Sequence, residues 1–131
     1  PILYVTGVKW LVERPRPITS VGSGLLPGDP SFPSGHTAAA VIVSVMMILI
    51  VRNFARSRFP DGEDDERANR RRVFLRRAII GAVALVVAVA CSRLLLGLHY
   101  PTDVIISATI CPLISYAVWC VWNACESAEE W

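Results

Sequence analysis

The sequence predicts an all-α protein, a bundle of transmembrane helices, and two features of its composition carry that prediction. Hydrophobic residues make up 53% of the 131 residues, and charged residues only 18%. The charge is also concentrated, because nine of the thirteen basic residues lie between Arg52 and Arg77, together with five of the eleven acidic ones. The rest of the chain is nearly uncharged, which is typical of membrane spans and argues against a soluble domain.

Apolar segments long enough to cross a bilayer occur three times. Roughly 20 residues of helix extend about 30 Å, the thickness of the hydrocarbon core. We therefore expect full spans at about residues 36–55, 78–98 and 103–122. Residues 2–12 are expected to form the end of a fourth span, so that residues 1–131 would be a single, N-terminally truncated domain.

Two connecting segments are predicted between these spans. Glycine and proline residues interrupt any regular pattern at 18–35, which indicates a loop. The charged segment 52–77 is expected to be a second loop with a mobile middle. The acidic residues beside its arginines argue against a nucleic-acid partner.

The basic residues of segment 52–77 also predict the orientation of the chain. Arginines that flank two spans favour the cytoplasmic side of the membrane, so this loop is expected in the cytoplasm. The alternation of the spans then places the polar residues near positions 9–16, 34–36 and 92–103 together on the extracytoplasmic face.

The stretch from Ser92 to Asp103 carries the most informative polar side chains. An Asp that accepts a hydrogen bond from one imidazole nitrogen fixes the tautomer of a histidine and leaves the other nitrogen free to attack, and Asp103 could do this for His99. A helix cap beside an interfacial histidine is the alternative interpretation. Arg93, with Ser92 before it, would either bind a phosphate oxygen or extend to the lipid headgroups.

The segment Pro33-Ser34-Gly35-His36 is predicted to open a helix. Gly35 would let a ligand approach the backbone closely, and the free N–H groups of the first turn favour an anion. His36 could then donate a proton to a leaving oxygen. The alternative is an ordinary cap, in which Ser34 precedes an alanine-rich helix.

Lys9 and Arg16 form a third polar group. They are seven residues apart, so on a helix they would share a face. Arg14, which also precedes a proline, is expected to contact lipid headgroups instead. Anchoring at the membrane interface is the alternative role for both cations of the pair.

These three groups match a tripartite signature in order and in spacing. Lys-x6-Arg-Pro occupies Lys9 to Pro17, Pro-Ser-Gly-His occupies Pro33 to His36, and Ser-Arg-x5-His-x3-Asp occupies Ser92 to Asp103. The chain therefore resembles the type 2 phosphatidic acid phosphatase superfamily, which includes lipid phosphate phosphatases, glucose-6-phosphatase and vanadium haloperoxidases. The resemblance runs from Lys9 to about Trp122 and implies the C-terminal part of a six-span phosphatase core.

The resemblance implies a role for each matching residue. His99 would be the nucleophile that becomes a phosphohistidine, Asp103 would orient it, and His36 would protonate the leaving group and then activate water. The phosphoryl oxygens would be held by Lys9, Arg16, Ser34, Gly35, Ser92 and Arg93. Because three cations can stabilise a phosphoryl group and the sequence shows no carboxylate cluster, we expect no metal and no cofactor.

The function predicted from the sequence is hydrolysis of a lipid phosphate or diphosphate monoester by an integral membrane enzyme at the extracytoplasmic face. The expected partners are the lipid phosphate substrate and membrane lipids, with no nucleic acid. The alternatives are a phosphotransferase with an alcohol acceptor, a vanadate-dependent haloperoxidase and a non-catalytic membrane scaffold.

Overall fold

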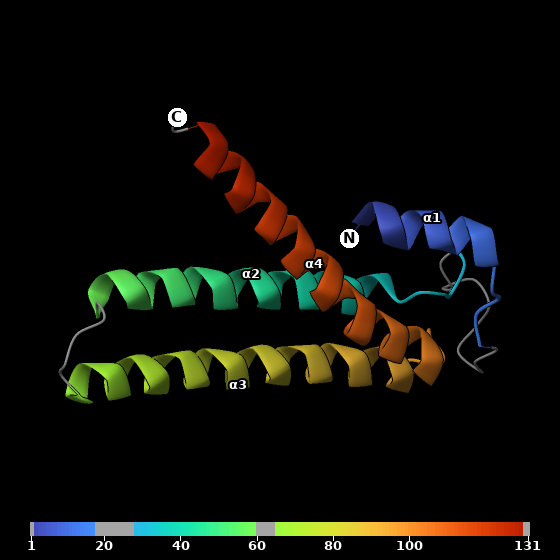
Figure 1. Cartoon of the computed structure of the whole chain (residues 1–131). Coiled ribbons are helices and arrows are strands. Elements are labelled where there is room, and N and C mark those ends of the chain that lie inside the picture. Colours follow the sequence, from blue (N-terminus) through green and yellow to red (C-terminus); the bar gives the residue numbers. More distant parts are fainter. Residues whose placement is uncertain (1, 18–27, 60–64, 130–131) are drawn as a thin grey trace.

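The fold of the computed structural model is all-helical, as the sequence predicts. The structure describes residues 2–17, 28–59 and 65–129, and within them it contains no strand. The helices are α1 (Ile2–Val12), α2 (Gly35–Arg58), α3 (Asp65–Leu95) and α4 (Pro101–Glu129) (Figure 1). By length and composition, α2, α3 and α4 are long and apolar enough to cross a membrane, which is consistent with a multi-pass membrane protein.

Helices α2 and α3 form an antiparallel pair that runs side by side along its length (Figure 1). Helix α4 crosses this pair at an angle, next to the end where α2 begins and α3 finishes, and α1 lies at the same end. A buried cluster of Val5, Ala38, Val41 and Cys111 joins α1, α2 and α4. Helices α1, α2 and α4 therefore share a buried core near the start of α2.

The segment predicted as the charged loop, 52–77, is mostly helical, so that prediction is wrong for most of its length. Helix α2 continues to Arg58 and α3 begins at Asp65, while positions 60–64 lie outside the described residues. Acidic Asp65 and Glu66 favour a helix N-terminus through the helix dipole. Arg70 also donates to the Glu66 carboxylate at 2.6 Å, one turn along the helix. Charged side chains thus extend α3 beyond its apolar part.

Helix α1 ends because the chain turns sharply at Glu13. Glu13 has a φ of 46°, in the left-handed region, and its N–H donates to the carbonyl of Lys9 at 2.9 Å. This geometry is a common way to end an α-helix. It sends Arg14 and Arg16 off the helix, so the expectation that Lys9 and Arg16 share a helix face is wrong.

Replacing Ala82 by leucine is expected to destabilise the α2–α3 pair. Ala82 is only 4% exposed, and its carbonyl accepts a hydrogen bond from the Ser44 hydroxyl at 3.3 Å, so the helices approach closely there. A larger side chain would force them apart at a cost of about 2 kcal/mol. Thermal unfolding in detergent measures this loss. Ala84 is exposed on the same helix, so Ala84→Leu is the matched control, and an equal effect of both changes would contradict the packing argument.

Candidate active site

The first turn of α2 presents the Pro-Ser-Gly-His segment, as the sequence predicts. Ser34 is the N-cap residue, and its hydroxyl accepts the backbone N–H of Thr37. The Ser34 side chain is fully buried and also hydrogen bonds to the Thr37 hydroxyl at 3.0 Å. Gly35 and His36 are the first two residues of the helix, and His36 is exposed.

The start of α4 is tied to the start of α2. The N–H of Ser34 donates to the carbonyl of Asp103 at 3.2 Å, and the Ser107 hydroxyl donates to the carbonyl of Ser34 at 3.0 Å. Helix α4 begins at Pro101, and the Asp103 carboxylate accepts the N–H of Tyr100 at 2.9 Å, which satisfies a donor at the helix end. These bonds fix the backbone around His36 relative to the backbone around His99.

His99 is a buried residue of the segment that joins α3 to α4, and its hydrogen bonds define its tautomer. Its Nδ1 lies 2.7 Å from the carbonyl oxygen of Ser31 and 3.5 Å from a carboxylate oxygen of Asp103. A carbonyl oxygen can only accept, so Nδ1 carries the proton and Nε2 of the neutral ring keeps its lone pair. Nε2 is 3.4 Å from Nη1 of Arg16, a donor. The orienting partner of His99 is thus a backbone carbonyl in addition to the predicted carboxylate.

Arg14 belongs to this site, and its predicted role as a headgroup contact is wrong. Its Nη1 lies 2.9 Å from the fully buried Asp103 carboxylate and 2.6 Å from the Thr102 hydroxyl. Its guanidinium also stacks 4.0 Å from the centre of the Tyr100 ring. Asp103 therefore carries an ion pair with Arg14 at a shorter distance than its contact with His99. The turn at Glu13, which no local motif signals, brings Arg14 there.

Lys9 and Arg16 both contact Asp29. One Asp29 carboxylate oxygen lies 2.5 Å from Nζ of Lys9, and the other lies 2.6 Å from Nη2 of Arg16. Burial tends to raise the pKa of Asp29, but the hydrogen bonds and positive charges of Lys9 and Arg16 outweigh it and lower the pKa to about 2. Arg16 also donates to the carbonyl of Leu98, next to His99, at 2.9 Å.

A cavity of about 390 Å³ lies where these groups meet. It is lined by Lys9, Arg16, Asp29, Gly35, His36, Ala39, Leu98 and His99. Five of the nine residues predicted for the site are in this lining, and they come from all three sequence blocks. The structure therefore places both histidines of the chain and two cations around one space.

The remaining predicted residues lie around the cavity and are absent from its lining. The Asp103 carboxylate lies 3.5 Å from Nδ1 of His99, and the Ser34 hydroxyl caps α2. Arg93 donates to the Ser92 hydroxyl at 3.1 Å near the end of α3. Within the described ranges 2–17, 28–59 and 65–129, no group of three His, Cys, Asp or Glu side chains could hold a metal ion.

Sequence reasoning missed Ser31 and Asp29 as parts of the site. Ser31 is fully buried, donates its N–H to the carbonyl of Arg14 at 2.8 Å, and contacts His99 through its own carbonyl. A contact made by a main-chain atom leaves no mark in residue type. Asp29 belongs to none of the three blocks, and its only signal in the sequence is a negative charge close to the second block.

An unprotonated imidazole nitrogen that shares a cavity with two cations and a second histidine is suited to the transfer of an anionic group. Together with three helices long and apolar enough to cross a membrane, this arrangement is consistent with a multi-pass membrane protein whose candidate site suits an anionic substrate. A family model described as the PAP2 superfamily matches residues 2–126, and the chain belongs to that superfamily. Membership supports a phosphatase-like function. No curated protein and no solved structure matches the chain.

His99 is expected to remain neutral below the pH at which an ordinary histidine is protonated. Burial lowers its pKa from the usual 6.5, and the charge of Arg16 acts in the same direction, against the Ser31 hydrogen bond and the Asp103 carboxylate. Because the sequence has two histidines, the variant His36→Gln leaves only His99 to titrate. Nitrogen NMR of that variant should give a midpoint below 6.5. A midpoint above that value would contradict the argument from burial.

Proposed function

We propose that the chain is an integral membrane phosphatase that hydrolyses a lipid phosphate or diphosphate monoester through a phosphohistidine intermediate on His99. The observation that supports this most directly is the unprotonated Nε2 of His99, in a residue that lines one cavity with Lys9 and Arg16. The long apolar helices beside this cavity suit a substrate whose tail stays in the bilayer. That the substrate is a lipid is itself part of the proposal.

In the first half of the proposed reaction, Nε2 of His99 attacks phosphorus. An N–P bond forms while the P–O bond to the leaving group breaks, and His36 gives its proton to the leaving oxygen. Lys9 and Arg16 stabilise the negative charge on the phosphoryl oxygens, which is the main need of such a transition state. Asp103 stabilises the positive charge on the phosphorylated ring, because its carboxylate lies 3.5 Å from Nδ1.

In the second half, water attacks the phosphohistidine. His36, now neutral, accepts a proton from the water, a new P–O bond forms, and the N–P bond breaks. Inorganic phosphate leaves, and His99 returns to its neutral state. Every proton in this scheme is moved by side chains of the chain, so the proposed reaction is independent of a metal ion, and full inhibition by EDTA would contradict that part.

Gly35, Ser92 and Arg93 are proposed as further donors to the phosphoryl oxygens, whereas Ser34, whose hydroxyl caps α2, would act by holding the first turn of that helix in place. Gly35 lines the cavity at the N-terminus of α2, where N–H groups favour an anion. Arg93 has a buried Nε with no hydrogen-bond partner among the described atoms, so its guanidinium keeps a bonding capacity that a phosphoryl oxygen could fill. Arg93→Lys tests this role through the KM for substrate.

The proposed site faces the extracytoplasmic side. The support is the arginine-rich opposite end of α2 and α3, which favours the cytoplasm. A single cysteine at position 57, in a variant without the four native cysteines, should react with an impermeant reagent only after the membrane is opened. Labelling of this cysteine from the outside of intact cells would show that the chain has the opposite orientation.

The deciding experiment is phosphate release from a panel of lipid monoesters and diphosphates by the protein in detergent, with trapping of the phosphoenzyme. Free phosphate as the sole phosphorus-containing product, with an acid-labile phosphoenzyme, supports the proposal. Transfer of the phosphoryl group to an added alcohol would favour the phosphotransferase. Bromide oxidation that depends on added vanadate would favour the haloperoxidase, and no turnover of any kind would favour a scaffold.

A further inference from the structure

Asp29 occupies the position that a substrate anion would need. Its two carboxylate oxygens contact Lys9 and Arg16 at 2.5 and 2.6 Å, and its backbone carbonyl accepts from Nε of Arg16 at 3.1 Å. It lines the same cavity as His36 and His99. The donors that the proposed function assigns to phosphoryl oxygens are therefore already bonded to a carboxylate of the chain.

We propose that Asp29 is a positioning residue that holds Lys9 and Arg16 in place before a phosphoryl group binds and competes with phosphate for them. This inference rests on the proposed function, which makes these two cations the phosphoryl donors. A carboxylate between two cations offsets their mutual repulsion and keeps both side chains in the cavity. A phosphoryl group must replace at least part of this contact when it binds.

The competition has a consequence for the end of the reaction. Inorganic phosphate and the Asp29 carboxylate are both anions that need the same two cations. When the N–P bond has broken, the return of Asp29 to Lys9 and Arg16 opposes retention of the product. The Asp29 side chain is 45% exposed, so it has room to turn aside for a substrate and come back without rearrangement of the helices.

Phosphate binding by Asp29→Asn tests the proposal, with inorganic phosphate titrated calorimetrically into the purified full chain. Asparagine keeps the size and one acceptor but removes the charge, so phosphate is expected to bind about tenfold more tightly. Product inhibition by phosphate should strengthen by the same factor. Asp29→Glu, which keeps the charge, should remain close to the parent protein.

The control is Glu13→Gln, which removes a negative charge from an exposed acid near Asp29 and should leave phosphate binding unchanged. Unchanged or weaker phosphate binding in Asp29→Asn and in Asp29→Ala would overturn the proposal. Binding is measured without turnover, so the two proposals fail separately. Tighter binding without any hydrolysis would refute only the phosphatase assignment, and hydrolysis with unchanged binding would refute only the role of Asp29.

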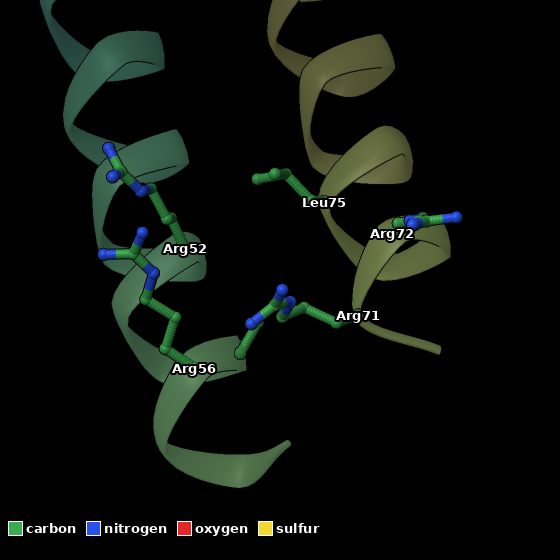
Figure 2. A pocket seen from close by; sticks show the side chains of 6 residues that line it. Arg52, Arg56, Arg71, Arg72 and Leu75 are labelled. Atoms are coloured by element: carbon green, nitrogen blue, oxygen red, sulfur yellow. The ribbon is translucent and has the colours of Figure 1, made fainter. Parts of the chain in front are cut away.

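A second inference comes from the far end of α2 and α3. A cavity of about 220 Å³ there is lined by Arg52, Ala55, Arg56, Arg71, Arg72 and Leu75. In Figure 2, Arg71 and Leu75 extend from α3 toward α2, whereas Arg72 extends from the other side of α3. Among the described residues, no acidic side chain is in this lining. Gly35 and Arg56 are 21 positions apart, or about 31 Å of helix, so this cavity is far from the histidine site.

We infer that this arginine-lined cavity binds the headgroup phosphate of an anionic phosphodiester lipid. Arginines at one membrane level attract anionic headgroups, and a phosphate among them offsets their repulsion. Apolar surface lies at the same helix ends, because Phe54 and Phe74 are both exposed and their rings are 6.3 Å apart. A lipid can use both surfaces at once, which a free phosphate ion cannot.

Lipid binding in nanodiscs, measured by native mass spectrometry, tests this second inference. Arg52→Gln/Arg56→Gln should lower the retention of phosphatidylglycerol about tenfold and leave phosphatidylcholine unaffected. Arg76→Gln/Arg77→Gln is the matched control, because it removes the same charge from exposed positions of α3 outside the cavity lining. Equal losses in both variants, or displacement of the lipid by millimolar inorganic phosphate, would overturn a specific headgroup site.

Discussion

Replacing His99 by glutamine is expected to lower turnover by roughly 10⁴-fold or more, because the side-chain amide cannot act as a nucleophile toward phosphorus. The acid-labile phosphoenzyme should vanish together with activity. Glutamine can still donate toward the Ser31 carbonyl, which is 2.7 Å from Nδ1 in the parent protein, so the fold should be kept. Rapid-quench trapping with radiolabelled substrate measures both quantities.

The companion variant His36→Gln separates the nucleophile from the general acid. It removes proton transfer to the leaving oxygen but keeps Nε2 of His99, so the loss should be smallest for substrates with good leaving groups. An activated aryl phosphate should still form the phosphoenzyme in this variant. Phosphoenzyme in His99→Gln, or the same loss for all leaving groups in His36→Gln, would contradict these assignments.

Replacing Arg14 by glutamine is expected to destabilise the protein by about 2 kcal/mol. Asp103 is completely buried, and its contact with Arg14 at 2.9 Å supplies its ion pair. Loss of one partner from a buried pair leaves a charge without compensation, which costs about 3–5 kcal/mol. We expect less here because the Arg14 side chain is 35% exposed and water can reach that side of the pair. Chemical unfolding in detergent measures the change.

The double variant Arg14→Gln/Asp103→Asn shows whether this loss comes from the pair. Removing both charges should be less damaging than the sum of the single changes, with an interaction energy of about 1–3 kcal/mol. Activity should stay low in the double variant, since the carboxylate near Nδ1 of His99 is also gone. Additive effects on stability would contradict a coupled pair.

The sequence was sufficient to predict which blocks meet and five of the side chains that share the cavity. The three blocks are far apart in the chain, and each lies at or near the end of an expected apolar segment, so the spans alone bring them to one level. Lys9, Arg16, Gly35, His36 and His99 do line one cavity. The helix start at the Pro-Ser-Gly-His segment was also predictable, because Ser34 is a favourable N-cap.

The partners of those side chains could not be predicted in the same way. Arg14 and Arg16 both precede a proline, and only the turn at Glu13 decides that Arg14 reaches Asp103 while Arg16 reaches Asp29 and the neighbourhood of His99. Helix ends within charged segments are also hard to predict, because low hydropathy is equally typical of a loop and of an exposed helix. In α3 the charged residues nevertheless form helix, and the Glu66–Arg70 pair one turn apart supports it.

The bonds that tie Ser34 to Asp103 and Ser107 have a mechanical consequence. Helices α2 and α4 touch near this junction and diverge beyond it (Figure 1). A membrane that is too thin or too thick for a helix is accommodated largely by tilting. Because the two helices are pinned where they begin, tilting swings their distant ends and leaves the spacing of His36 and His99 nearly constant. We therefore expect the chemistry to tolerate bilayers of different thickness, while the crossing angle of the helices follows the lipid.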